Sequence, residues 1–110
     1  MWKDYDDRIN ELFSNLRMIN KFPTVCPMCK KRGAHIYMHI YDDKTRRGGI
    51  WSWCSECYSF SHGSIYVPTY WKNCSMVELE RLSAVPIYLE EVKDKLDEHV
   101  NSIIADIEES

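Results

Sequence analysis

Hydrophobic positions near both ends of the chain recur with the period of an α-helix. Near the N-terminus the steps between them alternate between three and four residues, at Trp2, Tyr5, Ile9, Leu12, Leu16 and Ile19. This stripe predicts an amphipathic helix over residues 4–20. The Phe22-Pro23 dipeptide would end that helix, because proline disfavours the helical conformation of the residue before it.

The C-terminal region repeats this period in a longer stripe, at Leu89, Val92, Leu96, Val100, Ile103 and Ile107. The stripe predicts a helix that begins near Pro86, whose fixed φ suits a first helical turn. Upstream, Ser75 and Glu78 have the spacing of a capping box, in which each side chain satisfies a backbone N–H of the other residue. A short helix from this cap to Leu82 is therefore expected.

The middle of the chain, residues 24–73, alternates with a period of two, which is typical of strands. In residues 34–41 one predicted face carries Ile36, Met38 and Ile40, and the other carries His35, Tyr37, His39 and Tyr41. On such a strand His35 and His39 lie about 13 Å apart, too far to share one metal ion. We expect both histidines at exposed or half-buried polar positions.

Two further strands are predicted from the residues that follow. Residues 42–49 carry turn signals, and residues 50–53 then resume the alternation. Residues 64–67 read as a third strand, which Pro68 would end. The middle of the chain is therefore expected to form a hairpin or a small three-stranded sheet.

Candidate chemistry is concentrated in two Cys-x-x-Cys pairs, Cys26 with Cys29 and Cys54 with Cys57, which 24 residues separate. Two residues between thiols let a tight turn direct both sulfurs at one ion, and four thiolates are ligands that tetrahedral zinc prefers. Gly33 is expected to supply a positive φ near the first turn. With all four positions filled by thiolate, the single zinc ion per chain would be structural, because none remains for water or substrate.

The two pairs meet only if the segment between them folds back on itself. A hairpin that pairs Ala34 with Trp53 and Tyr41 with Arg46 would do this, with residues 42–45 as its loop. Both cysteine turns would then lie at the open end of the hairpin.

The motif Cys26-Pro27-x-Cys29, followed by Cys54-x-x-Cys57 at the other end of a hairpin, resembles a zinc ribbon over about residues 24–67. The resemblance implies structural zinc on these four cysteines and says little about activity, because the class is functionally diverse. Iron in the same ligands is an alternative, as are buried or redox cysteines. A thioredoxin-like motif needs a strand leading into a helix, whereas strands follow both pairs here.

The predicted elements combine into an α+β fold. A chain of 110 residues supports one domain. We expect an N-terminal helix within residues 1–22, a zinc ribbon over residues 23–73 and C-terminal helices over residues 74–110. No apolar run approaches the roughly 18 residues that span a bilayer, and no secretory signal is seen, so a cytoplasmic protein without membrane contact is expected.

Charge is distributed unevenly along the chain, whose formal net charge is −3. Residues 1–20 carry −1, residues 21–74 carry +5 and residues 75–110 carry −7. Acidic runs of this kind usually form a solvated helix face, and they also attract basic proteins. Four thiolates around Zn²⁺ add −2, which leaves the middle region at about +3.

These features favour a non-enzymatic protein-binding module with a basic partner. In size and charge the chain is similar to bacterial immunity and antitoxin proteins, which implies a toxin such as a basic nuclease as the partner. No nucleophile, open metal site or phosphate loop suggests an enzyme, and the fifth cysteine, Cys74, is expected to be a small buried hydrophobe.

The alternative is a nucleic-acid-binding ribbon. Its surface would combine two basic clusters with aromatic rings. The first cluster is residues 30–32, the second is Lys44, Arg46 and Arg47, and the rings are those of Trp51, Trp53, Tyr58 and Phe60. The basic clusters have plainer explanations, because the first can offset the charge of the metal site and the second can keep a turn soluble.

Overall fold

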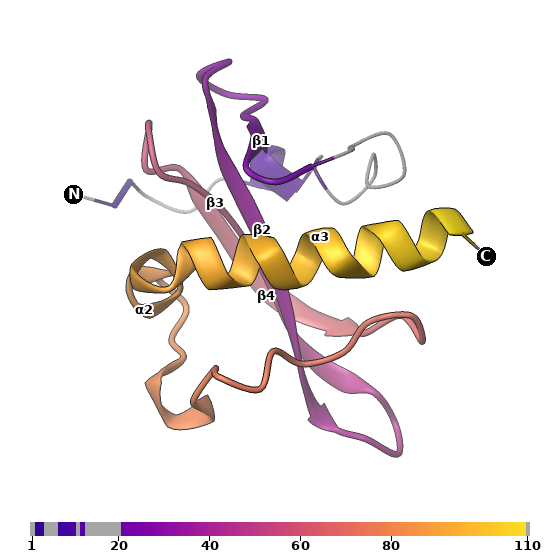
Figure 1. Ribbon diagram of the computed structural model, residues 1–110. Coiled ribbons are helices and arrows are strands. Elements are labelled where there is room, and N and C mark those ends of the chain that lie inside the picture. Colours follow the sequence, from indigo (N-terminus) through magenta and orange to yellow (C-terminus); the bar gives the residue numbers. More distant parts are fainter. Residues whose placement is uncertain (1, 4–6, 11, 13–20, 110) are drawn as a thin grey trace.

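A computed structural model describes residues 2–3, 7–10, 12 and 21–109 (Figure 1). In chain order its elements are η1 (Asp7–Asn10), β1 (Thr24–Val25), β2 (Arg32–Asp42), β3 (Arg47–Cys54), β4 (Phe60–Tyr66), η3 (Leu79–Arg81), α2 (Ile87–Glu91) and α3 (Lys93–Glu109). The strands form one antiparallel sheet in the order β1-β2-β3-β4, and α3 crosses one face of it (Figure 1). The chain is therefore α+β, as predicted.

Both faces of the sheet are covered, and this explains an error in the sequence analysis. Seven consecutive residues of β2 are buried, because α3 lies against one face and η1 packs against β3 and β4 on the side away from α3 (Figure 1). His35 is only 2% exposed and His39 only 7% exposed. The expectation that both are exposed or half-buried is therefore wrong.

The hairpin forms, but its register differs from the prediction by one residue. Ala34 lies opposite Cys54, and Asp42 lies opposite Arg47, with a bulge between Ile40 and Asp42. Arg46 closes the turn in the left-handed region (φ 63°) and donates its backbone N–H to the Asp42 carbonyl at 2.7 Å. The bulge adds a residue to β2 only, and the alternating pattern alone does not reveal it.

Gly48 lies beside this bulge, where the chain allows no side chain. A Cβ atom at Gly48 would clash with the backbone oxygen of His39, whereas one at Gly63 would meet only Ile50 Cγ2, at 3.8 Å. We expect Gly48→Ala to lower the free energy of unfolding by about 1–3 kcal/mol and Gly63→Ala to leave it nearly unchanged. Urea denaturation of both variants tests this, and equal midpoints would contradict it.

The C-terminal helical segment is confirmed but is interrupted at Val92, between α2 and α3, and the capping box is not formed. α2 begins directly after Pro86, and the predicted stripe is buried or half-buried along its length. Upstream there is only the three-residue 3-10 helix η3, and Glu78 makes no side-chain cap. Its backbone N–H donates instead to the Tyr88 hydroxyl at 3.1 Å. A hydrogen bond to the Tyr88 hydroxyl thus takes the place of the predicted hydrogen bond to a neighbouring side chain.

The predicted N-terminal helix over residues 4–20 lies largely outside the described residues. Within it, Asp7–Asn10 form the 3-10 helix η1. Ile9 and Leu12 belong to the core at 0% and 5% exposure, as their positions in the stripe predict. β4 corresponds to the predicted third strand but begins four residues earlier, at Phe60.

Among the described residues, no helix is both long enough and apolar enough to cross a membrane.

Candidate metal centre

Four cysteine sulfurs converge at one end of the sheet. Cys26 and Cys29 lie in the turn after β1, and Cys54 and Cys57 lie where β3 ends. All four sulfurs are within 4.8 Å of one another, and the Cys26–Cys57 and Cys29–Cys54 distances are both 3.8 Å. A tetrahedral ion with Zn–S bonds of about 2.3 Å places its sulfurs about 3.8 Å apart. The fold thus brings the sulfurs of all four predicted ligands together in an arrangement compatible with zinc.

The first cysteine turn is held by its own backbone. The Met28 N–H points to Cys26 Sγ at 3.3 Å, and the Lys30 N–H donates to the Cys26 carbonyl at 2.9 Å. The Cys26 N–H donates to the Lys31 carbonyl at 2.8 Å. Backbone amides therefore face the sulfur that would carry negative charge.

The second turn repeats these three contacts position for position. The Glu56 N–H points to Cys54 Sγ at 3.3 Å, the Tyr58 N–H donates to the Cys54 carbonyl at 3.0 Å, and the Cys54 N–H donates to the Ser59 carbonyl at 3.0 Å. Two turns of the same geometry thus face each other across the four sulfurs.

The positive φ that this turn requires lies at a different residue from the one predicted. It falls directly after the second cysteine of each pair, at Lys30 (66°) and Tyr58 (61°), and none of the described glycines has one. Gly33 has another role, because a Cβ there would lie 2.7 Å from Glu56 Cγ and its carbonyl accepts the Ser55 N–H at 2.8 Å. Its missing side chain lets the two turns approach each other.

The thiols differ in how readily they lose a proton. Burial raises the pKa of Cys26 and Cys54 above the ordinary 9.0. Burial also opposes the thiolate of Cys57, but hydrogen bonds from Ser59 and from the neighbouring thiols outweigh it and lower that pKa to about 7. A bound cation would displace the remaining protons, so metal binding at this site releases protons.

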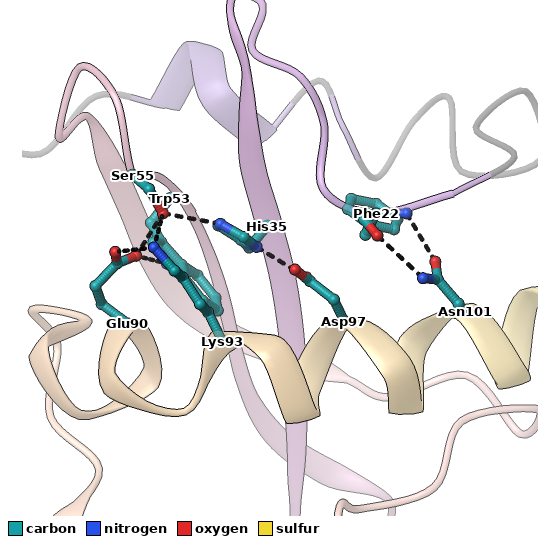
Figure 2. A network of polar contacts seen from close by, with 8 residues as sticks. All are labelled: Phe22, His35, Trp53, Ser55, Glu90, Lys93, Asp97 and Asn101. Carbon is teal, nitrogen blue, oxygen red and sulfur yellow. Dashed lines mark hydrogen bonds and ion pairs between the residues drawn. The ribbon is translucent and has the colours of Figure 1, made fainter.

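A polar network behind the second turn ties it to the helices (Figure 2). The Ser55 hydroxyl, which lies between the two cysteines of that turn, donates to Glu90 Oε1 at 2.6 Å. Trp53 Nε1 donates to the same oxygen at 3.1 Å, and Lys93 donates to Glu90 Oε2 at 2.9 Å. Glu90 therefore accepts from three side chains.

His35 extends this network into the core. Its Nε2 lies 2.8 Å from Ser55 Oγ, and its Nδ1 lies 2.8 Å from Oδ1 of the buried Asp97. The Ser55 hydroxyl donates to Glu90, and its oxygen can accept a hydrogen bond from Nε2 of His35. Ser55, His35 and Asp97 thus form a chain of polar contacts that connects the second cysteine turn to α3.

Helix α3 also holds the segment that precedes the first cysteine turn. Asn101 Nδ2 donates to the Phe22 carbonyl at 3.0 Å, and its Oδ1 accepts the Phe22 N–H at 2.7 Å. Figure 2 shows Lys93, Asp97 and Asn101 directed from α3 toward the strands. Sequence reasoning missed this row, although a spacing of four residues beside the apolar stripe is a signal of one helix face.

The charge of Glu90 makes this network sensitive to acid. Burial raises the pKa of Glu90, but hydrogen bonds from Ser55 and Lys93 outweigh burial and hold it below the usual 4.5. A depressed folded-state pKa stabilises the fold above the unfolded-state pKa, and this stabilisation is lost as pH falls through the folded-state value.

We therefore expect Glu90→Gln to be less stable than wild type at pH 7, where the Glu90 carboxylate is charged. Thermal unfolding of the zinc-loaded chains at pH 7, above the range in which protons displace the ion from the sulfurs, measures this, with the exposed Glu98→Gln as the matched control. Equal unfolding temperatures of Glu90→Gln and Glu98→Gln would contradict the role given to the Glu90 charge.

The predicted basic and aromatic face is not present as such. Trp51, Trp53 and Phe60 are at most 8% exposed, so their rings cannot stack on bases. Arg46 is not a simple solubilising charge, because its guanidinium donates to the carbonyls of Val67, Pro68 and Trp71. That part of the sequence interpretation is wrong.

Cys74 and His62 both lie outside the four-sulfur cluster. Cys74 is 8% exposed, which confirms that it is buried, and its backbone N–H donates to the Tyr37 hydroxyl at 3.0 Å. His62 stacks on Trp51 with ring centroids 4.5 Å apart. Neither belongs to the metal-ligand cluster that the described residues form.

Comparison of the chain with protein-family models, with curated proteins and with solved structures gave no match.

Proposed function

We propose that Cys26, Cys29, Cys54 and Cys57 bind one structural Zn²⁺ ion in a zinc ribbon, and that the protein is a non-enzymatic cytoplasmic module that binds a basic protein. An immunity or antitoxin type of inhibitor, acting on a basic nuclease toxin, fits this proposal. The observation that carries it is the set of four thiols that lie within 4.8 Å of one another, because an ion bound by all four would have no open position for a substrate.

We prefer zinc to iron because an ion at this site would act as a structural cross-link. Four thiolates suit either ion. The two turns cross-link the ends of β1, β2, β3 and β4, so that an ion between them would fix the sheet. Structural zinc sites supply folding free energy in this way.

The charge distribution supports a protein partner. Residues 75–110 carry −7, and a surface of that sign repels nucleic acid and attracts cationic proteins. Most of the large aromatic rings that a nucleic-acid ribbon would use are buried. Binding of nucleic acid therefore remains the second candidate.

Elemental analysis of protein purified without added metal tests the first half of the proposal. We expect one zinc and no iron per chain. Iron in its place, or a folded protein without metal, would refute the zinc assignment.

A pull-down from the source cells with the zinc-loaded chain as bait, read by mass spectrometry, tests the second half. We expect a basic protein that is retained after nuclease treatment. Direct titration with mixed DNA and RNA at low and physiological salt is the counter-test, since tight binding with a steep salt dependence would favour the nucleic-acid alternative.

A further inference from the structure

We infer that the partner docks on the η3–α2 lobe, residues 76–91, and that the docking segment of the partner is basic and amphipathic. This inference rests on the proposed function and names the surface and the chemistry that would serve it. Figure 1 shows the lobe in orange, projecting from the body of the protein beside the start of α3.

The lobe exposes three large apolar side chains that lie close together in the sequence. Met76 is 39% exposed, Leu79 is 53% exposed and Ile87 is 56% exposed. Exposed apolar groups that cluster within a polar rim are typical of protein-binding sites. Single exposed residues of this kind would carry no such meaning.

Tyr88 holds the segment that contains these side chains in one shape. Its hydroxyl donates to the Met76 carbonyl at 3.2 Å and accepts the Glu78 N–H at 3.1 Å. The residues before η3 are thereby fixed against α2. A surface that is ordered before binding loses less conformational entropy when a partner docks.

The charged residues of the lobe are mostly acidic. Residues 76–91 contain four glutamates and one cation, Arg81. The Arg81 guanidinium lies 3.1 Å from Glu91 and 3.6 Å from Glu78, and it also covers the ring of Tyr88 at 4.2 Å. Arg81 is thus engaged within the lobe, and Glu90 is paired with Lys93 in the network behind the second cysteine turn. The net charge over residues 76–93 is still −2, from four glutamates against Arg81 and Lys93.

Charge separates this lobe from the other exposed apolar residues. Tyr66 is 66% exposed, but the cation of Arg47 lies 5.3 Å from its ring, in the basic middle region of the chain. A basic partner would be repelled there and attracted to the glutamates of the lobe. Apolar area and negative charge therefore coincide at residues 76–91.

A synthetic peptide tests the inference without knowledge of the natural partner. The probe places leucine and lysine at the spacing of an amphipathic helix, and its control has the same composition in scrambled order. Titrated into the ¹⁵N-labelled zinc-loaded chain, the probe is expected to shift the amide signals of residues 76–91 more than those of the β2–β3 turn. The scrambled peptide is expected to bind more weakly.

Variants define the surface further. Leu79→Ser combined with Ile87→Ser is expected to weaken probe binding by about tenfold or more, whereas Tyr66→Ser, a matched loss of exposed apolar area outside the lobe, is expected to have little effect. Glu80→Lys, which changes only charge on the lobe, is expected to weaken binding most at low salt. Unchanged thermal unfolding confirms that each variant is folded.

Shifts centred on Tyr66, equal binding of the scrambled peptide or wild-type affinity of the Leu79/Ile87 variant would overturn the inference. Pull-downs with the same variants as bait distinguish a wrong docking site from a wrong proposed function. If the wild-type chain captures an identified basic protein that the lobe variant also captures, only the docking site is refuted. If the wild-type chain captures no protein, the proposed function itself is refuted.

Discussion

Replacing Cys29 with serine is expected to unfold the protein at neutral pH. Structural zinc contributes on the order of 10 kcal/mol to the folding of small metal-binding modules. Small domains have a total stability of about 5–15 kcal/mol, so loss of the ion removes most or all of it. Circular dichroism should show loss of the strands and of α3 as well, because Leu96 and Val100 of α3 are fully buried in the shared core.

Cys74→Ser is the matched control for this experiment. Cys74 is also a buried thiol, at 8% exposure, but it does not belong to the four-sulfur cluster. Its variant is expected to keep the metal and the fold. A Cys29→Ser protein that unfolds at the wild-type temperature would show that the cluster does not support the structure.

Removal of the metal by a chelator should reproduce the effect of Cys29→Ser in the wild-type chain. Because protons compete with the ion for the sulfurs, less chelator should be needed as pH falls from 8 to 6. The raised pKa values of Cys26 and Cys54 favour their protonated form and strengthen this dependence. Chelator sensitivity that does not change with pH would contradict thiolate ligation.

The cysteine cluster could be predicted because the information for it is local. Each Cys-x-x-Cys pair defines its own turn, and the hairpin between the pairs needs only to close. The contacts inside the turns were predictable only in part, since the positive φ falls at Lys30 and Tyr58 rather than at Gly33. Any residue can be forced into that conformation when neighbouring hydrogen bonds determine it, so the sequence does not mark the position.

Features that depend on distant residues could not be predicted. The bulge after Ile40 and the left-handed Arg46 together set the register of the hairpin, and Arg46 is held by carbonyls about twenty residues further along the chain. His35 looks like a polar residue on a half-exposed strand until its partner is known. That partner, Asp97, is 62 residues away.

The Asp97 carboxylate is therefore a position outside the cysteines where a substitution should lower stability. Asp97→Ala is expected to lower the free energy of unfolding by about 1–3 kcal/mol, because it leaves Nδ1 of the buried His35 without its hydrogen-bond partner. The exposed Asp94→Ala removes the same charge from the same helix and is expected to have little effect. Urea denaturation of the two zinc-loaded variants measures the difference.

Zinc affinity is a second measurement, and it distinguishes a role of Asp97 in positioning the metal site from a general loss of packing. Nε2 of His35 contacts the hydroxyl of Ser55, which lies inside the second cysteine turn, so release of His35 should loosen that turn. Asp97→Ala is expected to weaken zinc affinity by about 10–100-fold, as is typical when a group that orients a metal site is lost.

Replacing both partners, with His35→Phe and Asp97→Leu together, should restore much of the folding stability, because no buried polar group is left unpaired. The double variant should not restore the zinc affinity. If the double variant recovered both properties, or if Asp97→Ala bound zinc as tightly as wild type, the network would serve the core alone and not the metal site.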